Sequence, residues 1–139
     1  MAFERIVVAT DFSEAADAAL AVAVDLARRL GSELILVHAS EELGVVPGSD
    51  LAEDARRAAQ QQLDERLARL HAKDVRARGA VRGGLPLDVV VGTADDERAA
   101  LLVVGTRTQS RLAELFGSLV DSILDRAPCP VLAVRPPAA

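Results

Sequence analysis

Short runs of apolar residues alternate along the chain with longer segments in which apolar positions recur at helical spacing. The runs at 5–10 (RIVVAT), 34–38 (LILVH), 101–105 (LLVVG) and 131–134 (VLAV) are too short for helices and are rich in Val, Ile and Leu, which predicts strands. Residues 75–81 alternate more weakly with arginines, as expected of a half-exposed edge strand. This alternation of strand and helix patterns predicts an α/β fold.

Helical patterns occupy the segments between these strands. The first predicted helix begins at an N-cap, Ser13, and stops at Gly31, because hydroxyl side chains favour helix starts and glycine favours helix ends. The second begins at a capping pair formed by Asp50 and Glu53, and it continues to about Lys73. The polar residues between the second strand and this helix are expected to form a surface loop.

Two further helices complete the pattern. One runs from Pro86 to about Arg98, and the last carries Val120 and Ile123 on its apolar side and ends at Pro128. Five strands joined by right-handed helical crossovers form a doubly wound parallel sheet, whose ligands bind beyond the carboxyl ends of the strands. The order 3-2-1-4-5 brings the ends of the first and fourth strands together. We therefore predict one Rossmann-like domain over residues 1–139, with four helices.

Composition narrows the function classes. The chain has 139 residues, 50% of them hydrophobic and 27% charged, which suits one globular domain. The net charge of −5, scattered basic residues and the lack of Trp and Tyr argue against a nucleic-acid partner. No apolar stretch approaches the roughly 20 residues that cross a membrane. One cysteine, Cys129, and an N-terminus without a leader pattern lead us to expect a cytoplasmic protein.

Motifs for chemistry are scarce. Neither His38 nor His71 has a partner at metal-ligand spacing, and Cys129 is alone, so no metal site is predicted. His71 is expected to be solvated on a helix surface, and His38 to contact neighbouring polar groups. The sequence contains no G-x-S-x-G, G-x-x-x-x-G-K-[ST] or G-x-G-x-x-G motif. No catalytic residue is predicted, which favours binding over efficient catalysis.

Two long segments resemble the universal stress protein family: VVATDFSEAADAALAVAVDLARRLGSELILVHA and LLVVGTRTQSRLAELFGSLVDSILDRAPCPVLAVRP. The likeness covers essentially the whole chain and includes the strand ending in Asp11, the Gly84-x-Pro86 before the third helix and the Cys129-Pro130 before the last strand. Membership implies the 3-2-1-4-5 sheet of adenine nucleotide alpha hydrolase-like proteins and a homodimer. In one branch it also implies ATP, with Mg²⁺ accompanying it.

That branch holds the phosphates with a glycine pattern: glycine, two residues, glycine, nine residues, glycine, then Ser or Thr. Gly105 matches the first glycine and Gly117-Ser118 matches the closing pair, but Thr108 replaces the middle glycine and the loop is one residue short. Threonine resists the positive φ that glycine allows. The arginines and hydroxyls of the loop, with the amides that start the last helix, could still surround an anion.

We predict a set of nucleotide-binding residues drawn from three strand ends and the loop after the fourth strand, partly from the resemblance and partly from the chemistry by which that loop could surround an anion. They are Thr10, Asp11, Ala39, Gly105, Arg107, Thr108, Ser110, Gly117 and Ser118. In the family Asp11 would bond the nucleoside, and the backbone of Ala39 would meet adenine. Simpler alternatives stay open: Asp11 caps the helix, Gly105 serves a turn, and Gly117-Ser118 is an N-cap signal.

The last strand has an uncharged edge formed by Val131, Leu132, Ala133 and Val134. An unprotected edge invites pairing with a second chain, so a homodimer through this strand is expected, although flanking prolines alone could protect it. Three hypotheses follow: a stress-response protein that binds ATP and signals by occupancy, a homodimeric interaction module that has lost the nucleotide, and a slow ATPase.

Overall fold

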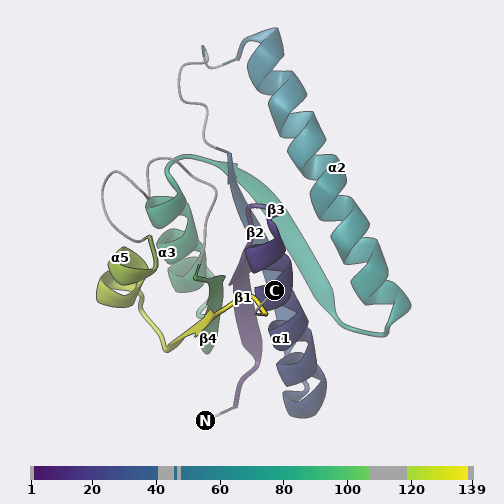
Figure 1. Cartoon of the computed structure of the whole chain (residues 1–139), viewed down its shortest axis with the longest axis vertical. Coiled ribbons are helices and arrows are strands. Elements are labelled where there is room, and N and C mark those ends of the chain that lie inside the picture. Colours follow the sequence, from purple (N-terminus) through teal and green to yellow (C-terminus); the bar gives the residue numbers. More distant parts are fainter. Residues whose placement is uncertain (1, 41–45, 47, 107–118, 138–139) are drawn as a thin grey trace.

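The computed structural model describes residues 2–40, 46, 48–106 and 119–137. Its strands pair in parallel in the order β3-β2-β1-β4-β5, as predicted. The elements in chain order are β1 (Arg5–Ala9), α1 (Glu14–Leu30), β2 (Glu33–Ser40), α2 (Asp50–Ala72), β3 (Ala77–Gly83), α3 (Pro86–Asp96), β4 (Leu101–Gly105), α5 (Leu119–Arg126) and β5 (Val131–Val134). The four described helices cover both faces of the sheet (Figure 1).

The central strands are buried on both faces, as their continuous apolarity predicts. Ile6, Val7 and Val8 of β1 are all fully buried. Because successive side chains alternate between faces, Ile6 and Val8 pack with α1 and α2, whereas Val7 packs with α3 and α5. The domain therefore has two cores separated by one sheet.

α1 has the predicted caps. The Ser13 hydroxyl accepts a hydrogen bond from Ala16 N at 3.1 Å, and Gly31 ends the helix with φ of 70°, the left-handed conformation that glycine adopts easily. The face of α1 against the sheet consists of small residues, namely Ala15, Ala16, Ala19, Ala23 and Ala27. Leu30 continues the same helical spacing but is exposed, because it lies in the last turn, beyond the core.

Several predicted boundaries are wrong by a few residues. The N-cap of α2 is Ser49, whose hydroxyl accepts from Ala52 N at 3.2 Å, while Asp50 and Glu53 lie in the first turn. β3 starts at Ala77 rather than Val75 because its register is set by pairing with β2. α3 stops at Asp96, before the predicted Arg98. In α5, the apolar Leu124 that follows the buried Ile123 is exposed.

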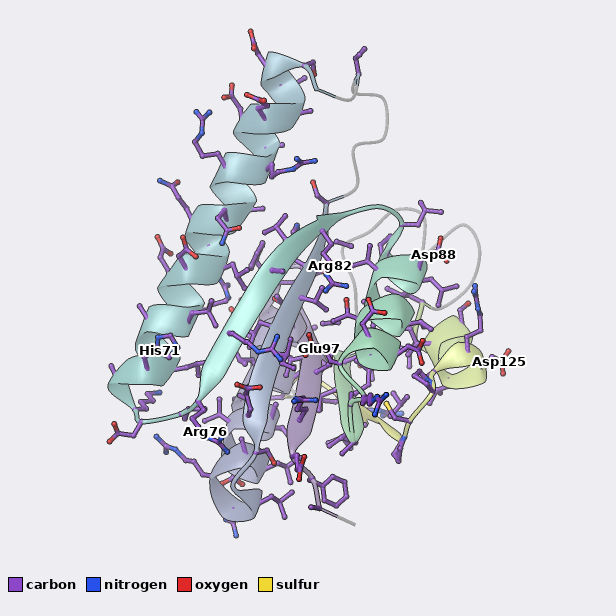
Figure 2. All side chains as sticks on the ribbon, turned by 180° about the vertical axis from the view of Figure 1, so that it is seen from behind. His71, Arg76, Arg82, Asp88, Glu97 and Asp125 are labelled. Atoms are coloured by element: carbon purple, nitrogen blue, oxygen red, sulfur yellow. The ribbon has the colours of Figure 1, made fainter. Side chains whose placement is uncertain are left out.

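A polar group of side chains connects β3 to the end of α3 on the face that α3 covers. Arg78 of β3 forms ion pairs with Glu97, which follows α3, and with Glu33 of β2. Figure 2 shows Glu97 and Arg82 along this part of the sheet. The hydrogen bond from Arg78 lowers the pKa of Glu97, outweighing the opposing effect of its partial burial. Charged contacts thus replace apolar packing at this edge.

Candidate functional site

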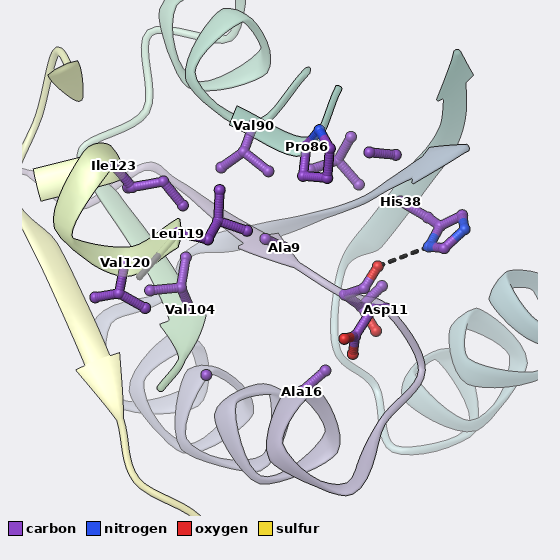
Figure 3. A pocket seen from close by; sticks show the side chains of 14 residues that line it. Ala9, Asp11, Ala16, His38, Pro86, Val90, Val104, Leu119, Val120 and Ile123 are labelled. Atoms are coloured by element: carbon purple, nitrogen blue, oxygen red, sulfur yellow. Dashed lines mark hydrogen bonds between the residues drawn. The ribbon is translucent and has the colours of Figure 1, made fainter. Parts of the chain in front are cut away.

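A cavity of about 90 Å³ opens at the carboxyl ends of β1, β2 and β4, on the face covered by α3 and α5. Most of its lining is apolar: Pro86 and Val90 come from α3, Val120 and Ile123 from α5, and Val104 from β4 (Figure 3). Polar groups gather at one end, where Thr10, Asp11 and His38 lie. Apolar walls with a few convergent polar groups are typical of small-molecule sites.

The turn after β1 holds its polar groups by short-range hydrogen bonds. The carboxylate of Asp11 accepts from Ser13 N at 3.0 Å, and the hydroxyl of Thr10 accepts from Phe12 N at 3.0 Å. Phe12 has φ of 64°, unusual for a residue other than glycine and costly by roughly 1–3 kcal/mol. Asp11 therefore supports the start of α1, as the alternative interpretation predicted, and it also lines the cavity.

Beyond this turn, the ladder between β1 and β2 ends. Its last hydrogen bond runs from Thr10 N to Val37 O, at 2.9 Å. In a parallel pair, every second residue of a strand directs both its N–H and its C=O to the same neighbour, so the next residue of β2 in this phase is Ala39. Its two backbone groups therefore face the side of β1 at a point where β1 has already ended. Ala39 also lines the cavity.

A stack of three side chains supports the turn from the side of α2. The guanidinium of Arg66 lies 4.8 Å from the centroid of the Phe12 ring, and the Phe12 ring stacks on His38 with centroids 4.4 Å apart. His38 Nδ1 lies 2.8 Å from Thr10 O. Because a carbonyl only accepts, Nδ1 carries the proton and donates. His38 thus contacts polar neighbours, as predicted.

Arg66 and Phe12 were not among the residues predicted from the sequence. Arg66 has a side chain only 8% exposed and makes two bonds to the carboxylate of Asp17, at 2.9 and 3.0 Å. Its spacing was the available signal, since it falls between Leu63 and Leu70 on the inward stripe of α2, where a charged residue is unusual unless paired. His71, expected to be solvated, is exposed but lies 2.7 Å from Ala77 O through Nε2.

Gly105 ends β4 beside the cavity, in contact with α1. A Cβ atom at this position would lie 2.8 Å from Ala15 O and 2.9 Å from Ala15 C, closer than such contacts occur. Close helix–sheet packing therefore accounts for this glycine, a reason that neither the turn nor the phosphate interpretation considered. The remaining predicted loop residues, Arg107, Thr108, Ser110, Gly117 and Ser118, lie outside the described residues.

The last strand of the chain, β5, forms an edge of the sheet. β5 pairs with β4 on one side, through Val131 to Val134, and is the last strand in the order of the sheet. Cys129, just before it, is half-buried, and burial raises the pKa of its thiol.

Among the described residues, no group of three or more His, Cys, Asp or Glu side chains could hold a metal ion. Within the same part of the chain, no helix is long and apolar enough to span a membrane.

Comparison with known proteins gives a consistent result. The family model described as the Universal stress protein family matches residues 2–135. A universal stress protein of Thermus aquaticus is 34% identical over 140 residues, covering 96% of this chain and 99% of its own.

Solved structures agree on the fold. Universal stress protein UspA from Lactobacillus plantarum superposes with a TM-score of 0.83 at 23% identity, covering 97% of this chain and 99% of its own. A universal stress protein solved in complex with cAMP superposes with a TM-score of 0.74 at 26% identity, covering 99% of this chain and 100% of its own.

Proposed function

The chain belongs to the universal stress protein family, and we propose that it binds an adenine nucleotide in the cavity beside Asp11 and Ala39. Occupancy, rather than turnover, is its output in this proposal. The observation that carries it is the meeting of a carboxylate, a pair of backbone groups at a strand end and an apolar cavity. The related structure that holds cAMP supports an adenine nucleotide as the class of ligand.

Each part of the cavity matches one part of a nucleoside. Adenine presents an acceptor at N1 beside a donor at its amino group, which is the complement of a backbone N–H beside a C=O such as those of Ala39. The carboxylate of Asp11 is an acceptor for ribose hydroxyls. The apolar side chains of α3 and α5 would cover the base. Guanine has the reverse donor–acceptor pattern, so it would leave both backbone groups unpaired, which is costly.

The phosphate part of the proposal depends on the glycine-rich loop. The predicted ligands there are Gly105, Arg107, Thr108, Ser110 and the Gly117-Ser118 pair, and all but Gly105 lie outside the described residues. ATP, with Mg²⁺ bound to its phosphates, is the expected ligand if the shortened loop still surrounds three phosphates. The described residues supply no cluster of metal ligands, so any Mg²⁺ would depend on the phosphates and on this loop.

Isothermal titration with AMP, ATP and GMP tests the proposal. We expect AMP and ATP to bind and GMP to bind at least about tenfold more weakly, because its edge leaves hydrogen-bonding groups unpaired. Asp11→Asn keeps an oxygen for Ser13 N–H but loses the charge, and should weaken AMP binding roughly tenfold. The matched control is Asp125→Asn, an exposed change on α5. Failure of both AMP and ATP to bind the wild-type protein would contradict the proposal.

The second proposed function is a homodimeric interaction module without nucleotide. The uncharged β5 edge, Val131 to Val134, favours it, since an edge strand offers unpaired backbone groups to a second chain. Sedimentation of the titrated samples separates the two proposals. A dimer that binds none of the nucleotides supports the module, and a dimer that binds AMP supports the first proposal and contradicts the module. ADP accumulating from ATP would support the slow ATPase.

A further inference from the structure

The rung that would follow the last hydrogen bond between β1 and β2 does not form. In the regular ladder, Ala39 N–H would donate to Thr10 O, and Ala39 C=O would accept from Phe12 N. Both of these partners are engaged by other groups. Thr10 O is contacted by Nδ1 of His38 at 2.8 Å, and Phe12 N donates to the hydroxyl of Thr10 at 3.0 Å. Two side chains thus take the partners of one backbone residue.

This diversion has a direct consequence for Ala39. A backbone amide that completes a ladder is already satisfied and has little to offer a ligand, whereas one beside the end of a strand can bond a ligand without losing a partner. We propose that His38 is a positioning residue for the nucleotide base. By donating to Thr10 O, its ring ends the β1–β2 ladder one rung early and leaves the N–H and C=O of Ala39 for the edge of adenine.

The ring of His38 is held in the orientation that this role requires. Phe12 stacks on one face of it with an angle of 27° between the rings, and Arg66 in turn lies over Phe12. Arg66 is fixed by its two bonds to Asp17 and a third contact, from Nη2 to Phe12 O at 3.4 Å. Because Phe12 is also kept in its left-handed conformation by this packing, the turn cannot relax into a continued strand without displacing the stack.

This inference takes its ligand from the proposed function, but its first test is made without any ligand. Amide hydrogen exchange of the ligand-free protein, followed by NMR, measures the state of the Ala39 N–H directly. In the wild-type protein we expect it to exchange at least about tenfold faster than Val37 N–H, which lies within the ladder. In His38→Leu the Thr10 carbonyl is released, the rung closes, and exchange at Ala39 should slow about tenfold, the effect of roughly one hydrogen bond.

Two further variants separate this role from a general loss of structure. His38→Asn places an amide N–H close to the position of Nδ1 and should restore wild-type exchange at Ala39. His71→Leu alters the other histidine, at the opposite end of the sheet, and should leave Ala39 unchanged. Val37 N–H serves as the internal reference in every variant, because its ladder bond does not involve His38. Equal exchange at Ala39 in the wild-type protein and in His38→Leu would overturn the inference.

Titration of the same variants with AMP tests the ligand separately. His38→Leu should bind AMP about tenfold more weakly than wild-type, and His38→Asn should bind it nearly as well. If wild-type protein binds no AMP but Ala39 exchanges as expected, the proposed function fails while the positioning role of His38 stands. If AMP binds equally well to wild-type and His38→Leu, the nucleotide proposal stands and the role of His38 is wrong.

Discussion

The helices α1 and α3/α5 lie on opposite faces of the sheet and present different side chains to it, and the cavity beside Asp11 lies on the face that α3 and α5 cover. Against one face, α1 presents alanines, and its backbone approaches β4 so closely that Gly105 has no room for a Cβ atom. Against the other, α3 and α5 present larger residues such as Val90 and Ile123. The spacing of a helix from its neighbour depends on the side chains between them. Small residues let α1 lie close to β4 at Gly105, whereas larger residues of α3 and α5 line the cavity at the strand ends.

The two faces serve different purposes: one holds the strands in place, and the other surrounds the space for a ligand. The α1 face fixes the relative positions of β1 and β4, whose ends carry Asp11 and Gly105. The α3/α5 face surrounds the space that a ligand would occupy. Changes on the first face should therefore be felt mainly in stability, and changes on the second mainly in binding.

The largest effect is expected at Gly105. Gly105→Ala would place a methyl group 2.8 Å from Ala15 O, and because backbone must move to relieve the contact, we expect a loss of about 2 kcal/mol in the free energy of unfolding. Gly92→Ala is the control, since nothing lies within 4 Å of its added Cβ and helix propensity should make it stabilising by about 0.5–1 kcal/mol. Urea denaturation measures both. Similar values for the two variants would show that α1 does not constrain Gly105.

A smaller, paired effect is expected at adjacent residues of β4 that face opposite sides. Val103 packs with α1 and Val104 lines the cavity. Val103→Ile should destabilise the protein by about 1–2 kcal/mol through overpacking, whereas Val104→Ile should change stability by less than about 1 kcal/mol because the cavity accepts the extra methylene.

The effects on AMP affinity should follow the reverse order. Val104→Ile should reduce affinity several-fold, and Val103→Ile should leave it almost unchanged. Thermal unfolding and isothermal titration on the same preparations measure the two properties. The comparison of the two faces breaks down if Val104→Ile is the more destabilising variant, or if it leaves AMP affinity intact.

The smallest effect is expected where the α3 face meets β3. Arg78 lowers the pKa of Glu97 in the folded protein, so the contribution of the pair is fully present above the unfolded pKa of glutamate and is lost as pH falls through the lower folded value. Because Arg78 is 48% exposed, solvent screening limits this contribution to about 0.5 kcal/mol. Glu97→Gln should therefore be less stable than wild-type at neutral pH but equal to it in acid.

Urea titrations from neutral to acidic pH, with exposed Glu65→Gln as the control, measure this difference. A deficit in Glu97→Gln that persists unchanged at low pH would mean that the ion pair is not its cause.

Periodicity and the family resemblance were sufficient to predict the strand order and the inward residues of the central strands, because buried parallel strands are almost continuously apolar. The boundaries of β3 could not be predicted in this way, since its first paired residue, Ala77, is set by pairing with Leu34 of another strand. Neighbouring polar residues obscured the cap of α2, where Ser49 precedes Asp50. Local patterns could not distinguish these alternatives.

The site was predicted in part. Asp11, Ala39 and Gly105 do lie together at the cavity, as the resemblance implied. The stack of Arg66, Phe12 and His38 joins residues up to 54 positions apart, so no local pattern could reveal it. The steric reason for Gly105 likewise depends on a contact with Ala15 that only the packed helix creates.

The single thiol of the chain lies just before the edge strand, at Cys129. Because burial raises its pKa, little of it is thiolate near neutral pH, and the thiolate is the form that reacts with alkylating reagents. The protein therefore carries, just before β5, a thiol that should react only slowly with alkylating reagents near neutral pH.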